Sequence, residues 1–261
     1  MKFRFLLFYI LISFVLIGLI VYIQKDNYII NEDDIKEDII ISDNNHNEMN
    51  ADVGMDDVDS DDVVSDDVGS DDVESVFIYK PLTNDIIDKI MDSSYKTNDE
   101  IKIEDLSYVQ VSYWGFDDKE YIGELIVNKM VAKDIVEIFS ELYDAKFPIK
   151  KISLIDEYNA DDNLSMSDNN TSAFNYRAIV GNEGKLSKHS YGLAIDINPV
   201  QNPYLKNGII LPKSGAEFLD RGKIEKGMIV EGDVCYNAFV NRGWTWGGEW
   251  NSVKDYQHFE K

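Results

Sequence analysis

Two short segments in the last third of the chain carry side chains that could act on a substrate together. The first is Ser187–Asp196, which contains His189, and the second is Asp255–His258. They offer two imidazoles and two carboxylates, which is enough for three metal ligands and one base. Catalytic zinc is usually held by three protein ligands, with the fourth position open for water. Since the chain contains only three histidines, these two segments are its best candidate for a zinc site.

The first segment is expected to fold as a turn followed by a strand. In Leu193–Asn198 the side chains alternate, so that Ile195 should face the core and Asp196 should face a cleft. Gly192 allows the chain to turn sharply before this strand. His189 can then fold back beside Asp196, which would be difficult if both residues lay in one regular element.

The second segment places a carboxylate near a histidine. Asp255 and His258 are three residues apart and would share a face on a helical turn. If His258 binds zinc, Asp255 lies within reach of the zinc-bound water, whose pKa the metal lowers to about 7, and can take its proton. A single His–Asp pair is more often a structural hydrogen bond, and an Asp-x-x-His spacing is a weaker signal still. The prediction of a zinc site therefore depends on both segments together.

The elements around these residues predict an α+β domain from Val76 onward. Apolar residues recur at helical spacing in one stretch and alternate at strand spacing in others. Because helices and strands do not alternate regularly, a doubly wound sheet is not favoured. The expected helices are Asn84–Met91, Met130–Ala145 and a short one from its cap Asp233 to about Asn241, and the expected strands are Tyr108–Tyr113, Tyr121–Val127 and Lys151–Ile155.

Charge is distributed unevenly along the chain. The formal net charge is −24, but residues 24–75 alone hold 19 acidic and 2 basic residues. This segment repeats Ser-Asp-Asp-Val, and its dense like charge and few apolar residues predict a disordered acidic linker. Residues 76–261 are only mildly acidic and contain no basic patch, so nucleic acid is not an expected partner. The single cysteine, Cys235, excludes an intrachain disulfide.

Residues 1–23 are predicted to form a transmembrane signal anchor. Phe5–Ile23 is a run of 19 residues without a charge, and as a helix it would span about 28 Å, close to the thickness of the hydrocarbon core of a bilayer. Lys2 and Arg4 precede this run, which favours a cytoplasmic N-terminus and a C-terminal domain outside the cell. The alternative is a cleaved signal peptide, but this would need a small-residue cleavage site, and no alanine occurs before Ala51.

The motifs resemble a known family of zinc peptidases. The pattern Ser-x-His-x-x-Gly-x-Ala-x-Asp in Ser187–Asp196, the tryptophan-rich Gly243–Trp250 and the final His-Phe-Glu are similar to the zinc D-alanyl-D-alanine carboxypeptidases. That family also contains peptidoglycan L-alanyl-D-glutamate endopeptidases. The resemblance covers about Ile152–Lys261 well and the residues from 76 to that point poorly. It implies a hedgehog/DD-peptidase-like fold, with a small antiparallel sheet and flanking helices.

The resemblance assigns roles to individual residues. It implies one zinc ion held by His189, Asp196 and His258, with Asp255 as the general base. Many members of the family have Glu at the position of the base, and the shorter Asp leaves the subfamily open. Arg177 matches an upstream arginine that can stabilise the oxyanion or hold a substrate carboxylate, because its charge is fixed and its donors form a fork. The alternative for Arg177 is a surface salt bridge.

Further residues have two open interpretations each. Ser187 either forms a hydrogen bond with the substrate or sets the turn before His189. Trp246, like Trp244 and Trp250, is expected to wall the metal cleft, although these rings could also stack on glycan rings.

The function that the resemblance implies is zinc-dependent hydrolysis of peptide bonds in peptidoglycan stem peptides, by a domain on the cell-wall side of the membrane. The enzyme would be either a carboxypeptidase or an endopeptidase. The alternative is a non-catalytic zinc-containing module that binds the wall or signals. The acid at position 255 argues against this alternative, because a purely structural site needs no base.

Overall fold

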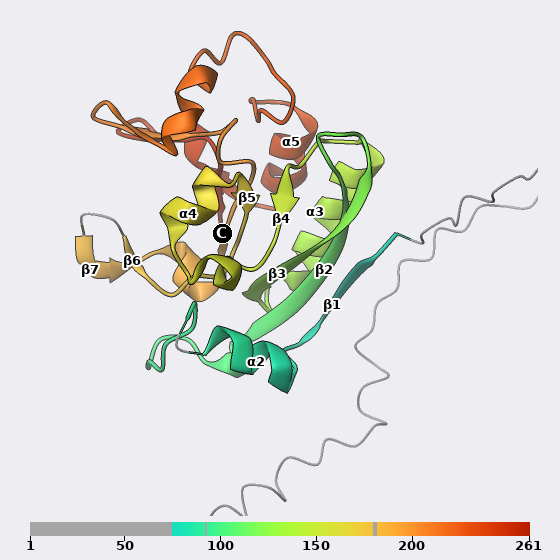
Figure 1. Ribbon diagram of the computed structural model, residues 1–261, viewed down its shortest axis with the longest axis vertical. Coiled ribbons are helices and arrows are strands. Elements are labelled where there is room, and N and C mark those ends of the chain that lie inside the picture. Colours follow the sequence, from blue (N-terminus) through green and yellow to red (C-terminus); the bar gives the residue numbers. More distant parts are fainter. Residues whose placement is uncertain (1–74, 92, 180–181) are drawn as a thin grey trace, which may run out of the picture. The chain divides into compact units, whose positions relative to one another are not determined.

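The computed structural model describes residues 75–91, 93–179 and 182–261 (Figure 1). The predicted signal anchor lies outside these residues, and so does the predicted linker up to residue 74. In the described part of the chain, no helix combines the length and the apolar character needed to cross a membrane. The anchor and the linker therefore stay predictions.

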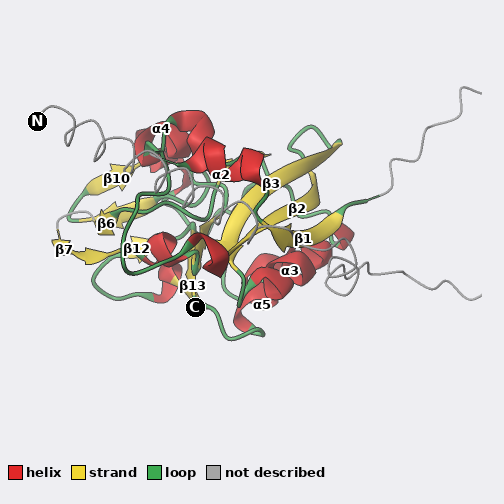
Figure 2. Ribbon diagram, turned by 90° about the horizontal axis from the view of Figure 1, so that it is seen from below, coloured by secondary structure: helices red, strands yellow, loops and turns green. Residues whose placement is uncertain are grey.

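The first half of the described chain is built around an antiparallel sheet that a helix covers on one face (Figure 2). The covering helix, α3 (Ala132–Asp144), packs on β1 and β2 through an apolar face that includes the buried Ile135 and Phe139. The apolar periodicity predicted this helix and the two long strands, and the structure confirms them. In spatial order the strands are β1 (Phe77–Pro81), β2 (Leu106–Trp114) and β3 (Glu120–Asn128), and α2 (Asn84–Ile90) follows β1 in the chain.

The second half consists of short strands, short helices and 3-10 turns. The strands are β4 (Lys151–Ile152), β5 (Asn170–Thr171), β6 (Ala178–Ile179), β7 (Asn182–Leu186), β8 (Ala194–Asp196), β9 (Tyr204–Lys206), β10 (Ile209–Leu211), β11 (Thr245–Trp246), β12 (Lys254–Asp255) and β13 (His258–Glu260). The helices are α4 (Asp162–Ser167) and α5 (Val234–Val240), and the 3-10 turns of the described chain are η1 (Ile103–Asp105), η2 (Ile155–Tyr158), η3 (Lys188–Tyr191), η4 (Lys213–Phe218) and η5 (Gly247–Glu249). The predicted α+β class is confirmed.

These strands form two small sheets and two separate pairs. One sheet has the order β11–β13–β8, and the other has the order β10–β9–β12. β6 and β7 form an antiparallel hairpin, whereas β4 and β5 are parallel. Because consecutive strands of the second half often belong to different sheets, residues that are distant in sequence become neighbours.

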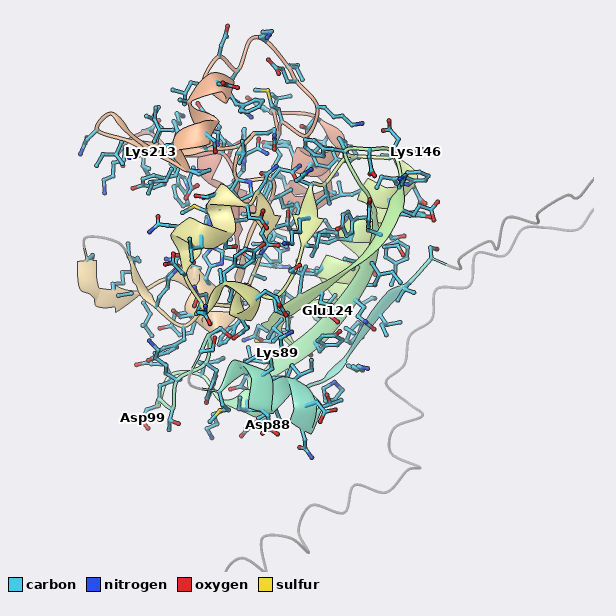
Figure 3. The ribbon with its side chains drawn as sticks, in the orientation of Figure 1. Asp88, Lys89, Asp99, Glu124, Lys146 and Lys213 are labelled. Atoms are coloured by element: carbon cyan, nitrogen blue, oxygen red, sulfur yellow. The ribbon has the colours of Figure 1, made fainter. Side chains whose placement is uncertain are left out.

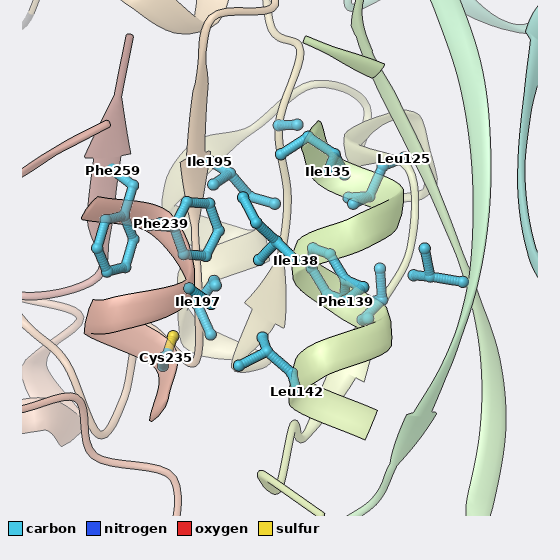
Figure 4. Close-up of a cluster of buried hydrophobic side chains, with 14 of the residues drawn as sticks. Leu125, Ile135, Ile138, Phe139, Leu142, Ile195, Ile197, Cys235, Phe239 and Phe259 are labelled. Atoms are coloured by element: carbon cyan, nitrogen blue, oxygen red, sulfur yellow. The ribbon is translucent and has the colours of Figure 1, made fainter. Parts of the chain in front are cut away.

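One hydrophobic core joins both halves of the described chain (Figure 4). Val109 of β2 and Ile138 of α3 belong to the same buried cluster as Ile195 of β8 and Phe239 of α5. The rings of Phe239 and Phe259 stack with their centroids 4.1 Å apart. Residues 76–150, which the family resemblance covers poorly, are thus part of the packing that supports β8 and β13.

The predicted strand at Lys151–Ile155 is shorter than expected. β4 ends at Ile152, and the apolar residues that follow enter η2. The Asn170 side chain accepts a hydrogen bond from the Ser153 amide (2.9 Å) and donates one to the Ser153 carbonyl (3.0 Å). This amide takes the place of a partner strand at Ser153, so the ladder stops there.

Candidate metal centre

His189 lies in the 3-10 turn η3, and its neighbours in the chain fix that turn. The Ser187 hydroxyl accepts a hydrogen bond from the His189 amide (3.3 Å) and caps the turn. Gly192 ends it with φ at +65°, and a Cβ at this position would lie 2.4 Å from the Asn128 amide nitrogen. The same amide donates to the Gly192 carbonyl (2.8 Å). The predicted turn at Gly192 is confirmed, and the end of β3 holds it in place.

Asp196 and His258 face each other from neighbouring strands. β8 and β13 are antiparallel, with His258 directly opposite Asp196. Alternation along β8 sends Ile195 into the core, where it is fully buried, and leaves Asp196 on the other face. The predicted orientation of Ile195 and Asp196 is confirmed, whereas Asn198 is fully buried and does not face the cavity. The pairing with β13 explains how residues 62 positions apart come together.

The three candidate ligands meet at one buried point. His258 Nδ1 lies 2.9 Å from Asp196 Oδ1, His189 Nε2 lies 3.2 Å from Asp196 Oδ2, and the two ring nitrogens are 3.2 Å apart. The three residues are only 3 %, 7 % and 6 % exposed for His189, Asp196 and His258. Ligands at about 2 Å from a tetrahedral zinc ion lie about 3.3 Å from one another. The donor types and their spacing therefore fit a metal ion with the tetrahedral geometry of zinc.

The outer nitrogen of each imidazole also has a partner. His189 Nδ1 donates to the Ala173 carbonyl (2.5 Å), and His258 Nε2 lies 3.2 Å from Glu260 Oε2. Such partners fix the tautomer, so that His189 presents Nε2 and His258 presents Nδ1 to a metal. Sequence reasoning missed the role of Glu260. Strand alternation could have found it, because residues two apart on a strand share a face.

The charges of Asp196 and His258 depend on each other. Burial alone would raise the pKa of Asp196, but His189 and His258 outweigh this effect and hold that pKa well below its usual range. Burial lowers the pKa of His258, whereas hydrogen bonds with Asp196 and Glu260 raise it to about 10. Asp196 is thus an anionic ligand at neutral pH, and a metal ion would replace the proton that His258 otherwise holds.

Asp255 and His258 lie on different strands, and the helical turn expected between them is wrong. Asp255 ends β12, the chain turns at Tyr256 and Gln257, and His258 begins β13. Each strand finds its own partner, β9 for β12 and β8 for β13, and a helical turn would forfeit both pairings.

Asp255 nevertheless lines the same cavity as the candidate ligands. It is half-buried, and its Oδ1 has no hydrogen-bond partner among the described residues. Burial raises the pKa of Asp255 to about 6. A shielded carboxylate oxygen without a partner, in a cavity with metal-ligand side chains, is suited to accept a proton.

Arg177 is held in the cavity wall by an ion pair. Its Nε contacts Asp162 Oδ2 at the start of α4, and the other oxygen of Asp162 accepts from Asn175 Nδ2 (2.8 Å). The Arg177 amide donates to Ser190 Oγ (2.9 Å), which ties this residue to the η3 turn. The guanidinium group has more N–H donors than one ion pair uses. Arg177 can therefore keep this ion pair and still bind a substrate carboxylate or an oxyanion.

The structure separates the roles of the other candidates. Ser187 lines the cavity and also caps the turn, so its hydroxyl has a structural partner. Trp250 lines the cavity, with its ring centroid 5.4 Å from that of His258. Trp246 and Trp244 are core residues, and Trp246 Nε1 donates to the Tyr256 carbonyl (2.8 Å). The structure therefore places Trp250, and not Trp246, in the cavity wall.

One cavity of about 410 Å³ collects the polar candidates. A volume of this size is typical of sites that bind small molecules or short peptide segments. Its wall includes the following candidates from the sequence: Arg177, Ser187, His189, Asp196, Asp255 and His258.

Comparison with known proteins supports the resemblance. The family model described as D-alanyl-D-alanine carboxypeptidase matches residues 181–261, a segment that includes the three candidate ligands. The predicted resemblance to this family is confirmed over the matched segment, and it indicates a peptidase. No curated protein and no solved structure gives a significant match to the chain. The hedgehog-like fold therefore stays a prediction.

Proposed function

We propose that this chain, whose last third matches the D-alanyl-D-alanine carboxypeptidases, is a zinc-dependent peptidase that hydrolyses peptide bonds in peptidoglycan stem peptides. One observation carries the proposal. His189, Asp196 and His258 are buried and converge at one point of a cavity, and this cavity also contains Asp255 Oδ1, which has no hydrogen-bond partner in the described part of the chain. A structural zinc site is usually closed by four protein ligands, whereas three ligands and a nearby base suit hydrolysis.

Each residue of the site has its own role in the proposed hydrolysis. Bound zinc would supply Lewis-acid polarisation of the scissile carbonyl and a pKa of about 7 for the attacking water. Asp255 Oδ1 accepts the proton of that water and later passes it to the leaving amine. Arg177 opposes the negative charge that develops on the carbonyl oxygen. Trp250 shields the site from bulk solvent beside His258.

The products of digestion identify which peptide bond the enzyme cleaves. A carboxypeptidase releases free D-alanine, whereas an endopeptidase exposes a new internal amine. Mass spectrometry of muropeptides after digestion with the full-length, zinc-loaded chain distinguishes these two products.

The decisive variant is Asp255→Asn, with Asp99→Asn as a matched control. Asp255→Asn should bind zinc and fold, but lose hydrolysis of purified peptidoglycan, because an amide cannot accept the proton. Asp99 is exposed and lies outside the cavity wall, so its variant should keep full activity. Removal of zinc with a chelator should abolish cleavage, and added zinc should restore it. Full activity of Asp255→Asn would remove this residue from the mechanism.

A non-catalytic module that binds the wall is the second candidate. Binding to sacculi by the zinc-loaded chain without any new amine groups would favour this function. The raised pKa of Asp255 and its Oδ1, which has no hydrogen-bond partner among the described residues, support the hydrolase instead, because a binding module gains nothing from a shielded carboxylate oxygen without a partner.

We further propose that residues 1–23 anchor the protein in the membrane as a single span, with the C-terminal domain on the cell-wall side. The apolar run Phe5–Ile23 and the preceding Lys2 and Arg4 support this arrangement. A membrane fraction that resists carbonate extraction, together with digestion of the domain by protease added outside the membrane, would test it. Recovery of the protein in the soluble fraction would count against the anchor.

A further inference from the structure

Two antiparallel hairpins contribute matching residues to the wall of the cavity. The β6–β7 hairpin contributes Lys185 and Leu186, and the β9–β10 hairpin contributes Lys206 and Leu211. Figure 2 shows β6, β7 and β10 on the same side of the fold, away from β1. A peptide that enters the cavity thus meets one lysine from each hairpin.

Three of the four acidic side chains in the wall already have a partner. Asp162 pairs with Arg177, and both Asp196 and Glu260 contact His258. The remaining acid is the proposed base. None of these contacts involves Lys185 or Lys206.

The two hairpin lysines are exposed, and no ion pair among the described side chains involves Lys185 or Lys206. Lys188 also lines the cavity, but its Nζ donates to the Lys261 carbonyl (3.0 Å). Three lysines thus line the cavity, and the ammonium groups of Lys185 and Lys206 are in no ion pair with the described side chains.

We infer that the cavity selects acidic peptides, with Lys185 and Lys206 binding free carboxylates of the substrate near the scissile bond. This inference rests on the proposed peptidase function. The two ammonium groups in the cavity wall attract an anionic peptide toward the candidate metal centre and disfavour a peptide that carries no negative charge. A lysine ammonium is a compact charge on a flexible stem, which suits a carboxylate whose position varies among substrates.

The size of the effect follows from the exposure of both lysines. Exposed ion pairs are weak, so the loss of one lysine should raise KM for an acidic peptide about two- to fivefold, and the loss of both about tenfold. The change should appear in KM rather than in kcat. It should fade with salt, because the Debye length falls from about 10 Å at 0.1 M to about 3 Å at 1 M.

The test uses two synthetic stem peptides that differ only at the glutamate carboxyl group, which is free in one and amidated in the other. Full-length, zinc-loaded protein is compared with Lys185→Gln, Lys206→Gln and the double variant. Lys146→Gln is the matched control, because Lys146 is exposed just beyond the end of α3, on the opposite side of the view from the β6–β7 hairpin (Figures 1 and 3).

The wild-type protein should have the lower KM for the acidic peptide, the double variant should lose this preference, and Lys146→Gln should keep it. Equal KM values for the two peptides, or an unchanged preference in the double variant, would overturn the inference and leave the peptidase function standing. Cleavage of neither peptide, with zinc bound, would overturn both.

Discussion

Replacing Glu260 should weaken zinc binding while the domain stays folded. Glu260 is half-buried, and its Oε2 lies 3.2 Å from His258 Nε2, the ring nitrogen that points away from the ligand set. The hydrogen bond with His258 is the main cause that lowers the pKa of Glu260. Loss of such an outer partner typically costs about 10–100-fold in metal affinity, or about 1.4–2.7 kcal/mol.

Two variants separate the charge of Glu260 from its hydrogen bond. Glu260→Gln keeps an oxygen that accepts from His258 Nε2, so it should weaken zinc binding by about tenfold or less. Glu260→Ala removes the acceptor as well and should approach the hundredfold limit. Glu249→Ala is the control, because Glu249 is exposed and bonds to the hydroxyl of Tyr236 rather than to a ligand (2.6 Å).

Competition with a chromophoric chelator measures the zinc dissociation constant of each variant, and thermal unfolding in excess chelator reports the stability of the metal-free fold. The reasoning requires a loss of affinity that exceeds any change shown by the control. If Glu260→Ala bound zinc as tightly as the wild-type protein, the assignment of His258 Nδ1 as the ligand atom would be wrong.

The remaining predictions concern stability and pH. Zinc at 100 times its dissociation constant should stabilise the fold by about 2.7 kcal/mol, and calorimetry should show Tm falling on chelation; an unchanged Tm would argue against tight binding. Gly192→Ala should lower both Tm and zinc affinity, since a left-handed φ costs about 1–2 kcal/mol and the new Cβ would clash with the backbone of β3. Gly208→Ala is the control: it has the same backbone strain without the clash and should leave zinc affinity intact. Phe239→Ala should lose about 3–5 kcal/mol in urea unfolding, and the exposed Leu164→Ala should lose far less; equal losses would contradict the described core. Burial raises the pKa of Asp255 to about 6, and the base acts only when ionised, so kcat/KM should fall as pH drops through or below that value; a descent that begins above pH 7 would exclude Asp255.

The long regular elements could be predicted because their signal is local. The apolar residues of α3 recur with the helical period, and residues Tyr108–Tyr113 of β2 alternate in sequence, so each pattern is complete within a dozen or so residues. The turn between His189 and Asp196 was equally readable, because Gly192 adopts a positive φ that other residues rarely adopt. Elements of two or three residues gave no comparable signal, and the predicted end of β4 was accordingly wrong.

The geometry of the site depends on which strands pair with each other, and the sequence pattern within one strand does not reveal its partner. Asp196 and His258 meet because β8 and β13 are adjacent, and the pattern around each residue does not name the other strand. The same limit explains why Asp255 was expected on a helical turn, whereas the contact of Glu260 with His258 could have been found from the alternation of β13. Arg177 was singled out by resemblance, whereas its partner Asp162 follows only from the packing of α4.

The shared core has a practical consequence for shortening this chain. The family match begins at residue 181, yet Ile195, Phe239 and Phe259 belong to the same core as α3, which ends at residue 144. A fragment trimmed to the matched residues would turn these side chains toward water, and apolar patches of that kind promote precipitation. Expression trials should therefore start at or before β1, well upstream of the boundary that sequence similarity suggests.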